Sequence, residues 1–322
     1  MKLRGKGPMR LSGSSIQEFV EDVPCDLCGH RNEEHLFDKQ GTLTGYVFRV
    51  VVCRDCCLMY LNPRLNDTGL SLLYDGQYYR GGGFDPHVNY LSDVDDNQQR
   101  ASWLEAHEHI ACLNEICPPP ARMLDLGCGI GSLLRLARNV GYDADGFEIS
   151  QFASDYVEGI GFRVFRNTKE LPSGHYDVVT AVEVLEHCSS ATQLLKAVYD
   201  CLKPGGIFYY TTTNFDGYVE KLKRGIDTPN LNGYILPEGH VCFFSTATMR
   251  RYLEKSGFSR TVPYYARRYE KGSRVYKMLR RLHLASEAAE SPQTAIQKAA
   301  YFIAQRGAGL FGLRRRFPLA IK

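Results

Sequence analysis

The sequence predicts an α/β protein, in which a doubly wound sheet follows a small cysteine-rich domain and precedes a helical C-terminal extension. Three observations predict this class. Residues 123–139 are typical of a buried strand, a glycine-rich turn and a helix in succession. Short apolar segments then alternate with helical patterns as far as about residue 213, as in a parallel sheet with helical crossovers. Two C-x2-C pairs stand ahead of this region.

Composition places the chain among ordinary globular proteins. Its 322 residues suffice for one large domain with smaller additions, and 44% of them are hydrophobic. We find no apolar run of 18 residues and therefore expect no transmembrane helix. Residues 1–20 lack the apolar core of a secretory signal, so we expect a flexible tail and a cytoplasmic protein. The 11 cysteines then imply a reducing compartment, where thiols bind metal or pack as small apolar groups.

The net charge of +3 hides an uneven distribution. From Ser245 onward there are 17 Lys and Arg against 4 Asp and Glu, and before that point there are 22 against 32. A basic C-terminal region suits an anionic partner, and it equally suits a solvated helical face.

The first candidate site is a pair of cysteine knuckles. Cys25 and Cys28 form one C-x2-C pair, Cys53 and Cys56 form another, and 24 residues separate the pairs. Four thiolates make a closed tetrahedral zinc site, which leaves no open position for chemistry, so we expect structural zinc in a ribbon over residues 21–65. Cys57 adds a fifth thiol and leaves the identity of the fourth ligand open.

Residues 66–97 link this ribbon to the next domain and are rich in tyrosine and glycine. Their aromatic side chains suit either a lid over a cofactor or packing between the two domains. A helical pattern over 98–116 follows, and Cys117-Pro-Pro-Pro120 ends it. We place the domain boundary before this helix.

The glycine turn predicts close approach of the backbone to a ligand. Asp125 precedes Gly127, Gly129 and Gly131, and glycine is needed where a turn takes positive φ or a side chain would hold a ligand away. A dinucleotide fingerprint would require glycine at position 132, which is Ser132. The turn also lacks the Lys-Ser/Thr pair of a P-loop.

The alternation of strands and helices continues after this turn. A second strand over 142–149 ends at Glu148, 23 residues beyond Asp125, where a carboxylate can accept hydrogen bonds from ribose hydroxyls. We expect further strands over 162–165, 176–181, 207–213 and 259–266, and helices over 194–202 and 245–257.

These motifs together resemble the class I S-adenosylmethionine (SAM)-dependent methyltransferases, which have a Rossmann-like doubly wound fold. The resemblance rests on D-x-G-x-G-x-G, the downstream acid, Y-D-V-V, L-E-H and L-K-P-G-G, over about residues 98–260. With the knuckles in front, it is similar to a bacterial subfamily associated with glycan and natural-product biosynthesis. The resemblance implies a methyltransferase domain over 98–270. It implies SAM binding by Asp125, Gly127, Cys128, Gly129, Gly131, Glu148, Asn167, Thr168 and Glu183.

The segment after the fourth strand reads E-x-x-E-H, at Glu183, Glu186 and His187. It resembles small-RNA 2′-O-methyltransferases and ubiquinone-pathway catechol O-methyltransferases, where such a motif helps to hold a divalent metal. His240 is placed to supply a further ligand. Three roles stay open for these residues, which are metal ligation, proton transfer by a metal-free histidine, and positioning.

Residues 214–239 form a long segment with amides, tyrosines and cations, which suits recognition of a hydroxyl-rich or phosphorylated acceptor. Residues 271–322 form a basic extension with helical patterns over 276–284 and 294–313. We favour packing of these helices on the body or at a dimer interface over contact with the inner membrane surface.

The sequence therefore predicts a SAM-dependent enzyme that O-methylates a sugar, a glycolipid or another polar small molecule. An RNA-directed methyltransferase is the close alternative, and it would bind RNA with strong salt dependence. Two further alternatives are methylation of a sugar carbon and a non-catalytic role as a SAM-binding scaffold.

Overall fold

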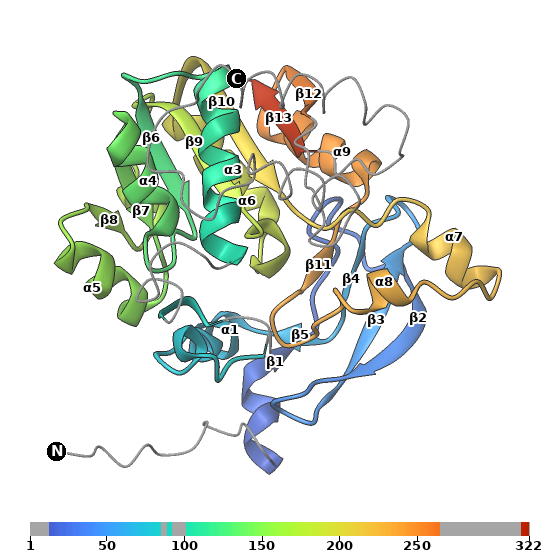
Figure 1. The fold of residues 1–322 in the computed structure, drawn as a ribbon. Helices are drawn as coiled ribbons and strands as arrows, with labels where there is room; N and C mark the ends of the chain where they lie inside the picture. Colours follow the sequence, from blue (N-terminus) through green and yellow to red (C-terminus); the bar gives the residue numbers. More distant parts are fainter. Residues whose placement is uncertain (1–12, 85–88, 92–100, 265–316, 322) are drawn as a thin grey trace, which may run out of the picture.

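The computed structural model describes residues 13–84, 89–91, 101–264 and 317–321 (Figure 1). Their main element is a seven-stranded sheet with the order β12-β13-β10-β9-β6-β7-β8. The five strands from β10 to β8 pair in parallel, and β13 lies antiparallel between β10 and β12. The strands are β6 (Arg122–Leu126), β7 (Asp143–Phe147), β8 (Val164–Phe165), β9 (Tyr176–Val182), β10 (Leu202–Thr211), β12 (Arg260–Tyr264) and β13 (Phe317–Ile321).

Helices cover both faces of this sheet because side chains alternate along each buried strand. Leu124 of β6 belongs to a core cluster that includes the buried face of α6, whereas the adjacent Met123 belongs to a second cluster with α3 and α4. The predicted α/β class and doubly wound sheet are confirmed. The main helices are α3 (Ala101–Ile116), α4 (Ser132–Val140), α5 (Gln151–Gly159), α6 (Ala191–Cys201) and α9 (Thr246–Ser256).

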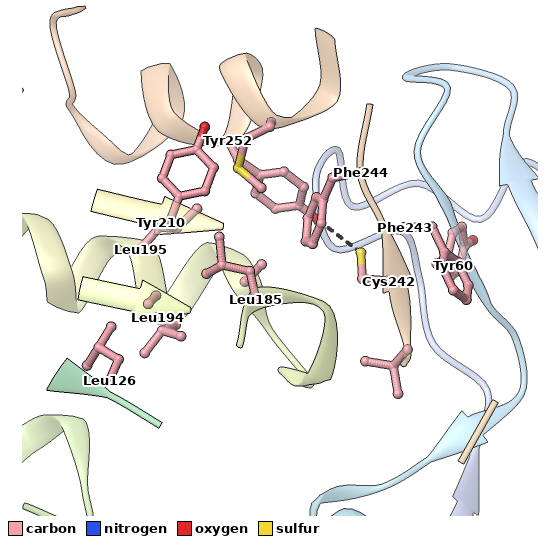
Figure 2. Packing of buried hydrophobic residues seen from close by; sticks show 14 of the residues in the cluster. Tyr60, Leu126, Leu185, Leu194, Leu195, Tyr210, Cys242, Phe243, Phe244 and Tyr252 are labelled. Carbon is pink, nitrogen blue, oxygen red and sulfur yellow. Dashed lines mark hydrogen bonds between the residues drawn. The ribbon is translucent and has the colours of Figure 1, made fainter. Parts of the chain in front are cut away.

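The N-terminal region forms a second, antiparallel sheet with the order β11-β4-β3-β2. Its strands are β2 (Glu33–Gln40), β3 (Val47–Cys53), β4 (Met59–Leu61) and β11 (Cys242–Phe243). The last strand comes from far along the chain and pairs antiparallel with β4. One continuous apolar cluster joins the two sheets, and Figure 2 shows it running from Leu126 through Tyr210 and Phe244 to Tyr60. The ribbon and the larger fold therefore share a hydrophobic core.

Several short elements complete the described fold. β1 (Val20–Glu21) pairs antiparallel with β5 (Arg64–Leu65), and α1 (Asp67–Leu73) follows with an Asn66 cap. The others are the 3₁₀ helices η1 (Gly13–Phe19), η2 (Tyr78–Arg80), η3 (Thr168–Glu170) and η4 (Leu185–His187), and the helices α7 (Tyr218–Lys223) and α8 (Pro229–Asn232).

Three expectations need comment. Residues 1–20 were expected to be a flexible tail, but η1 begins at Gly13, contacts α1 and places the apolar side chain of Ile16 in the shared core. The basic extension was expected to be helical, but its last residues form β13, which completes the sheet between β10 and β12. The helices expected over 276–284 and 294–313 lie outside the described residues. Within the described ranges, no helix combines the length and the hydrophobicity that a membrane span requires.

Candidate active site

The glycine turn after β6 has the backbone geometry that its sequence demands. Gly127, Gly129 and Gly131 have φ values of +61°, +54° and +82°. A Cβ at Gly127 would lie 2.7 Å from Val184 Cγ2, so this position has neither the conformation nor the space for a side chain. The turn leads directly into α4 and presents a bare backbone at the carboxyl edge of the sheet, where ligands of such folds bind.

Two buried carboxylates lie beside this turn. Glu148, after β7, accepts hydrogen bonds from the Gly129 N–H at 2.9 Å and the Ser150 N–H at 2.8 Å. Asp125 accepts a hydrogen bond from Thr180 Oγ1 at 2.7 Å. Burial raises the pKa of Asp125 to about 7, and burial also raises the pKa of Glu148. Burial at both sites therefore favours the protonated, neutral form of the carboxyl group.

Three of the other four predicted cofactor contacts are placed differently. The Cys128 side chain packs in an apolar cluster with Leu134 and Val157, and its Sγ lies only 2.7 Å from where a Gly146 Cβ would stand. Only the backbone of Cys128 therefore remains for a ligand. Asn167 is exposed and caps η3 by accepting a hydrogen bond from Lys169 N–H at 3.0 Å, and Thr168 begins that helix.

The two glutamates of E-x-x-E-H differ in environment. Glu183 is exposed and takes the left-handed φ of +52°, which is uncommon for a residue other than glycine and is typical of functional sites. Glu186 is only 3% exposed, and neither carboxylate oxygen has a hydrogen-bond partner among the described residues. Burial raises the pKa of Glu186 well above its usual value, and the charge of Glu183 raises it further.

His187 and His240 come together from separate segments, with ring centroids 4.6 Å apart. His187 Nδ1 lies 3.0 Å from the Gly239 carbonyl oxygen, and His240 Nδ1 lies 2.6 Å from the Tyr234 carbonyl oxygen. A carbonyl only accepts, so each Nδ1 must carry the proton when it makes this bond, and the lone pair is then on Nε2. Burial lowers the pKa of His187 well below its usual value, which keeps the ring neutral.

The aromatic segment after α1 covers both parts of the site. The Tyr74 hydroxyl lies 2.9 Å from His187 Nδ1, and with that nitrogen protonated the hydroxyl oxygen is a second acceptor of the N–H beside the Gly239 carbonyl. The Tyr74 carbonyl accepts a hydrogen bond from Ser150 Oγ at 2.5 Å. Phe84 lies over Gly239, where a Cβ would stand 2.2 Å from its ring. Tyr79 stacks on Phe152 with a centroid distance of 5.7 Å. The segment therefore contacts the residues that follow Glu148 as well as the histidines.

A sequence model of the family described as "Methyltransferase domain" matches residues 94–261, which is more than half of the chain. The chain belongs to this family. It is a SAM-dependent methyltransferase, and the glycine turn, the acidic residues and the E-x-x-E-H segment all lie within the matched range.

Relatives of this methyltransferase include proteins named ubiquinone biosynthesis O-methyltransferase. The one from Burkholderia pseudomallei is 29% identical over 187 residues, which cover 54% of this chain and 76% of the relative. The one from Burkholderia orbicola is 30% identical over 141 residues, which cover 41% and 57%.

Similar solved structures include a SAM-dependent methyltransferase from Archaeoglobus fulgidus. It is 19% identical with a TM-score of 0.46, and the match covers 72% of this chain and all of that one. A phosphoethanolamine N-methyltransferase 2 from Haemonchus contortus is 16% identical with a TM-score of 0.43, over 67% of this chain and 52% of that one. The fold assignment rests on the strand order and the family match.

The methyltransferase carries its four predicted zinc ligands in one cluster. Cys25 Sγ lies 3.3 Å from Cys56 Sγ, and Cys28 Sγ lies 3.5 Å from Cys53 Sγ. All four sulfur atoms lie within 4.8 Å of one another, and the two distances above exceed the length of a disulfide bond by more than about 1 Å. A tetrahedral ion with sulfur at about 2.3 Å requires sulfur atoms roughly 3.8 Å apart, so the cluster fits zinc.

The backbone explains why Cys56, and not Cys57, faces this cluster. Gly29 N–H donates to the Cys25 carbonyl at 2.7 Å with a φ of +80°, which closes the first knuckle. Cys57 N–H donates to the Cys53 carbonyl at 2.9 Å with a φ of +63°, so Cys57 occupies the position of Gly29 in the second knuckle. Its thiol is exposed as a result. Alignment of C-x2-C-G (Cys25–Gly29) with C-x2-C-C (Cys53–Cys57) pairs Cys57 with Gly29, so the sequence alone could have identified Cys56 as the fourth ligand.

The first knuckle also contacts the methyltransferase fold directly. Asp26 lies between the two cysteines, and its carboxylate accepts hydrogen bonds from Ser190 Oγ at 2.6 Å and Thr192 N–H at 2.9 Å at the start of α6. Lys255 Nζ of α9 donates to the Leu27 carbonyl at 2.8 Å. The cysteine cluster therefore holds the loop whose residues Asp26 and Leu27 bond to α6 and α9 of the larger fold.

Sequence reasoning missed three residues of the site. Tyr74 contacts His187, and Gly239 supplies the carbonyl that fixes that ring. Glu238, which is 1% exposed, binds a ribbon turn. Tyr74 was expected only as one aromatic of a lid or packing segment, and no local pattern identifies its partner more than a hundred residues away.

Proposed function

We propose that this methyltransferase transfers the methyl group of SAM to a hydroxyl of a polar small molecule, such as a sugar or a glycolipid. The observation that carries the proposal is the pair of histidines, each with Nδ1 against a backbone carbonyl. His187 follows three residues after Val184, whose side chain packs against Gly127 of the glycine turn. A neutral imidazole in that tautomer is suited to accept the hydroxyl proton. The names of the Burkholderia relatives support an O-methyltransferase.

SAM, when bound, supplies a methyl group already activated as a sulfonium. The chain must therefore hold the cofactor and an acceptor in line and take up one proton. In this proposal the backbone of the glycine turn and Glu148 bind the cofactor, and Glu183 and Asp125 are further side chains in contact with it. Asn167 and Thr168, at the start of η3, are the candidates for contact with the adenine base. His187 or His240 takes the acceptor proton at Nε2.

A second candidate role for the same cluster is binding of a divalent metal. Ligand atoms of Glu186, His187 and His240 lie within 4.8 Å of one another. Among the described residues the buried carboxylate of Glu186 makes no well-formed hydrogen bond, and its polar neighbours include Glu183 and Thr212, so its oxygens could serve as ligands of a cation. A carboxylate with two imidazoles suits Mg, Mn or Zn. Such an ion would favour acceptors with two adjacent hydroxyls.

The proposal includes structural zinc on Cys25, Cys28, Cys53 and Cys56, and a division into a ribbon over 21–65, a covering segment over 66–97 and a methyltransferase domain over 98–270. Recognition of RNA, methylation of carbon and a non-catalytic scaffold are the competing functions. Contact of the basic region over 271–322 with an anionic surface stays an expectation, since 265–316 lie outside the described residues.

The test is release of S-adenosylhomocysteine (SAH) from SAM across a panel of sugars, glycolipids and catechols, before and after chelation, with an RNA pool at two salt concentrations. We expect turnover with a hydroxylated small molecule, lowered about a hundredfold or more by His187→Gln or His240→Gln. Cys117→Ser, remote from the site, is the control. Turnover only with RNA, or SAM binding without turnover on any acceptor, would reject the proposal. Loss of turnover on chelation with zinc retained would favour the metal role.

A further inference from the structure

One turn of the chain, Leu236–His240, carries contacts to both histidines of the site. Gly239 N–H and His240 N–H both donate to the Leu236 carbonyl, at 3.0 and 2.7 Å, which makes the turn compact. His240 belongs to the turn, and His187 donates to the Gly239 carbonyl at 3.0 Å. The position of this turn therefore sets the position of both rings.

Glu238 ties this turn to the ribbon. Its Oε1 accepts hydrogen bonds from Leu43 N–H at 2.8 Å, Thr44 N–H at 3.1 Å and Thr44 Oγ1 at 3.2 Å, in the loop that connects β2 and β3. The side chain is 1% exposed. A Cβ on Gly41 would lie 2.2 Å from this same oxygen, so the ribbon loop closes around the carboxylate. Three hydrogen bonds that converge on one buried carboxyl oxygen make a strong local anchor.

The residues after the turn are fixed to the ribbon as well. Val241 N–H donates to the Glu186 carbonyl at 2.8 Å, and the Val241 carbonyl accepts from Leu61 N–H at 3.0 Å. Cys242 and Phe243 then form β11, which pairs with β4. Figure 1 shows β11 beside the ribbon strands and away from β10, which precedes it in the chain. The ribbon thus holds the turn on both sides of His240.

We propose that Glu238 is a positioning residue through which the cysteine-rich ribbon holds His187 and His240 in their working geometry. This inference rests on the proposed function, because it assigns to the ribbon a role in acceptor chemistry. Within the described ranges, Glu148 accepts its hydrogen bonds from Gly129 and Ser150, whereas Glu238 accepts from Leu43 and Thr44, so cofactor binding should not depend on this anchor.

The test compares Glu238→Ala, Glu238→Gln and Gly41→Ala in the full chain. Glu238→Ala removes the three hydrogen bonds, whereas Glu238→Gln keeps an acceptor oxygen in the same place. Gly41→Ala substitutes a residue of the ribbon and leaves Glu238 itself in place in the sequence. The added Cβ would lie 2.2 Å from Glu238 Oε1 and would therefore displace that carboxylate. Gly159→Ala is the matched control, because a Cβ there meets nothing within 4 Å.

Two readouts are needed. The first is the affinity for SAH by calorimetry, together with kcat and KM for any acceptor found. The second is the histidine side-chain NMR spectrum, with signals assigned from His187→Gln and His240→Gln, which requires no acceptor.

We expect shifted or broadened His187 and His240 signals in Glu238→Ala and Gly41→Ala, and near wild-type signals in Glu238→Gln. The kcat should fall about tenfold or more in the first two variants, since displacements near 1 Å are costly, while SAH affinity stays within about twofold. Unchanged histidine signals and kcat in folded Glu238→Ala would overturn the inference. Altered signals without turnover on any acceptor would support the positioning role and reject the proposed function.

Discussion

Replacing Asp125 with Asn should stabilise the protein, and increasingly so as the pH rises. Asp125 is 4% exposed, and burial raises its pKa from 3.8 to about 7. A raised carboxyl pKa means that the folded state holds its proton more tightly than the unfolded state. The contribution of Asp125 to stability is therefore lost as the pH rises from about 4 to about 7. Asn keeps the size and lacks the charge.

The expected size follows from the two pKa values. A difference of about 3 units, at about 1.4 kcal/mol per unit, corresponds to about 4 kcal/mol at pH 8 and about 1.5 kcal/mol at pH 5. The advantage of Asp125→Asn over the wild type should thus grow by about 2.5 kcal/mol between these values. The variant should bind SAM more weakly, because the proposed cofactor site loses the Asp125 carboxylate. Substitutions that stabilise a binding site commonly reduce its function in this way.

Urea unfolding of both proteins at pH 5, 6, 7 and 8 without SAM measures this difference. Asp177→Asn is the control of opposite sign. The Asp177 carboxylate bonds to Lys203 at 2.7 Å and to Arg122 N–H at 2.8 Å, and these contacts lower its pKa. Its ionised form stabilises the fold, so Asp177→Asn should be less stable than the wild type at pH 8. Parallel stability curves for the wild type and Asp125→Asn would refute the reasoning.

Three further predictions concern the other parts of the molecule. Cys56→Ser should lose zinc and stability, whereas Cys57→Ser should keep one zinc per chain by elemental analysis, and equal zinc loss in both would contradict the assignment. Gly127→Ala should abolish SAM binding and cost about 1–3 kcal/mol of stability, because of its φ of +61° and the nearby Val184. Gly159→Ala, at the end of α5, should keep SAM binding and should not lower stability. Tyr74→Phe removes the hydroxyl 2.9 Å from His187 Nδ1 and should lower turnover about tenfold with SAM affinity unchanged. Tyr142→Phe, which removes a hydroxyl bonded to the Cys117 carbonyl at 2.6 Å far from the site, should leave turnover as it is.

The features predicted well from the sequence are those whose chemistry is local. Asp125 to Gly131 lie within one turn, where glycine is required by the backbone itself, and β6 and α4 follow from the adjacent apolar patterns. The capped helix expected over 245–257 is confirmed, with a Ser245 capping box and a left-handed Gly257. Each of these depends on residues a few positions apart.

The features that were missed depend on contacts between distant segments. Glu238 meets Leu43 and Thr44 almost two hundred positions away, and nothing in P-E-G-H indicates that pairing. β11 pairs with β4, which lies about 180 residues earlier in the chain. β13 is a short strand that pairs with both β10 and β12. Such pairings are set by the assembled core and not by local pattern.

Calorimetric titration of the purified protein with SAM tests the central claim most directly. We expect one site per chain in the wild type. Binding should be lost in Glu148→Ala, whose carboxylate holds Gly129 at 2.9 Å, and should persist in His187→Gln, whose ring belongs to the acceptor side. Absence of SAM binding in the wild type would contradict the account. Binding that survives Glu148→Ala and disappears in His187→Gln would show that the cofactor and acceptor sites are assigned the wrong way round.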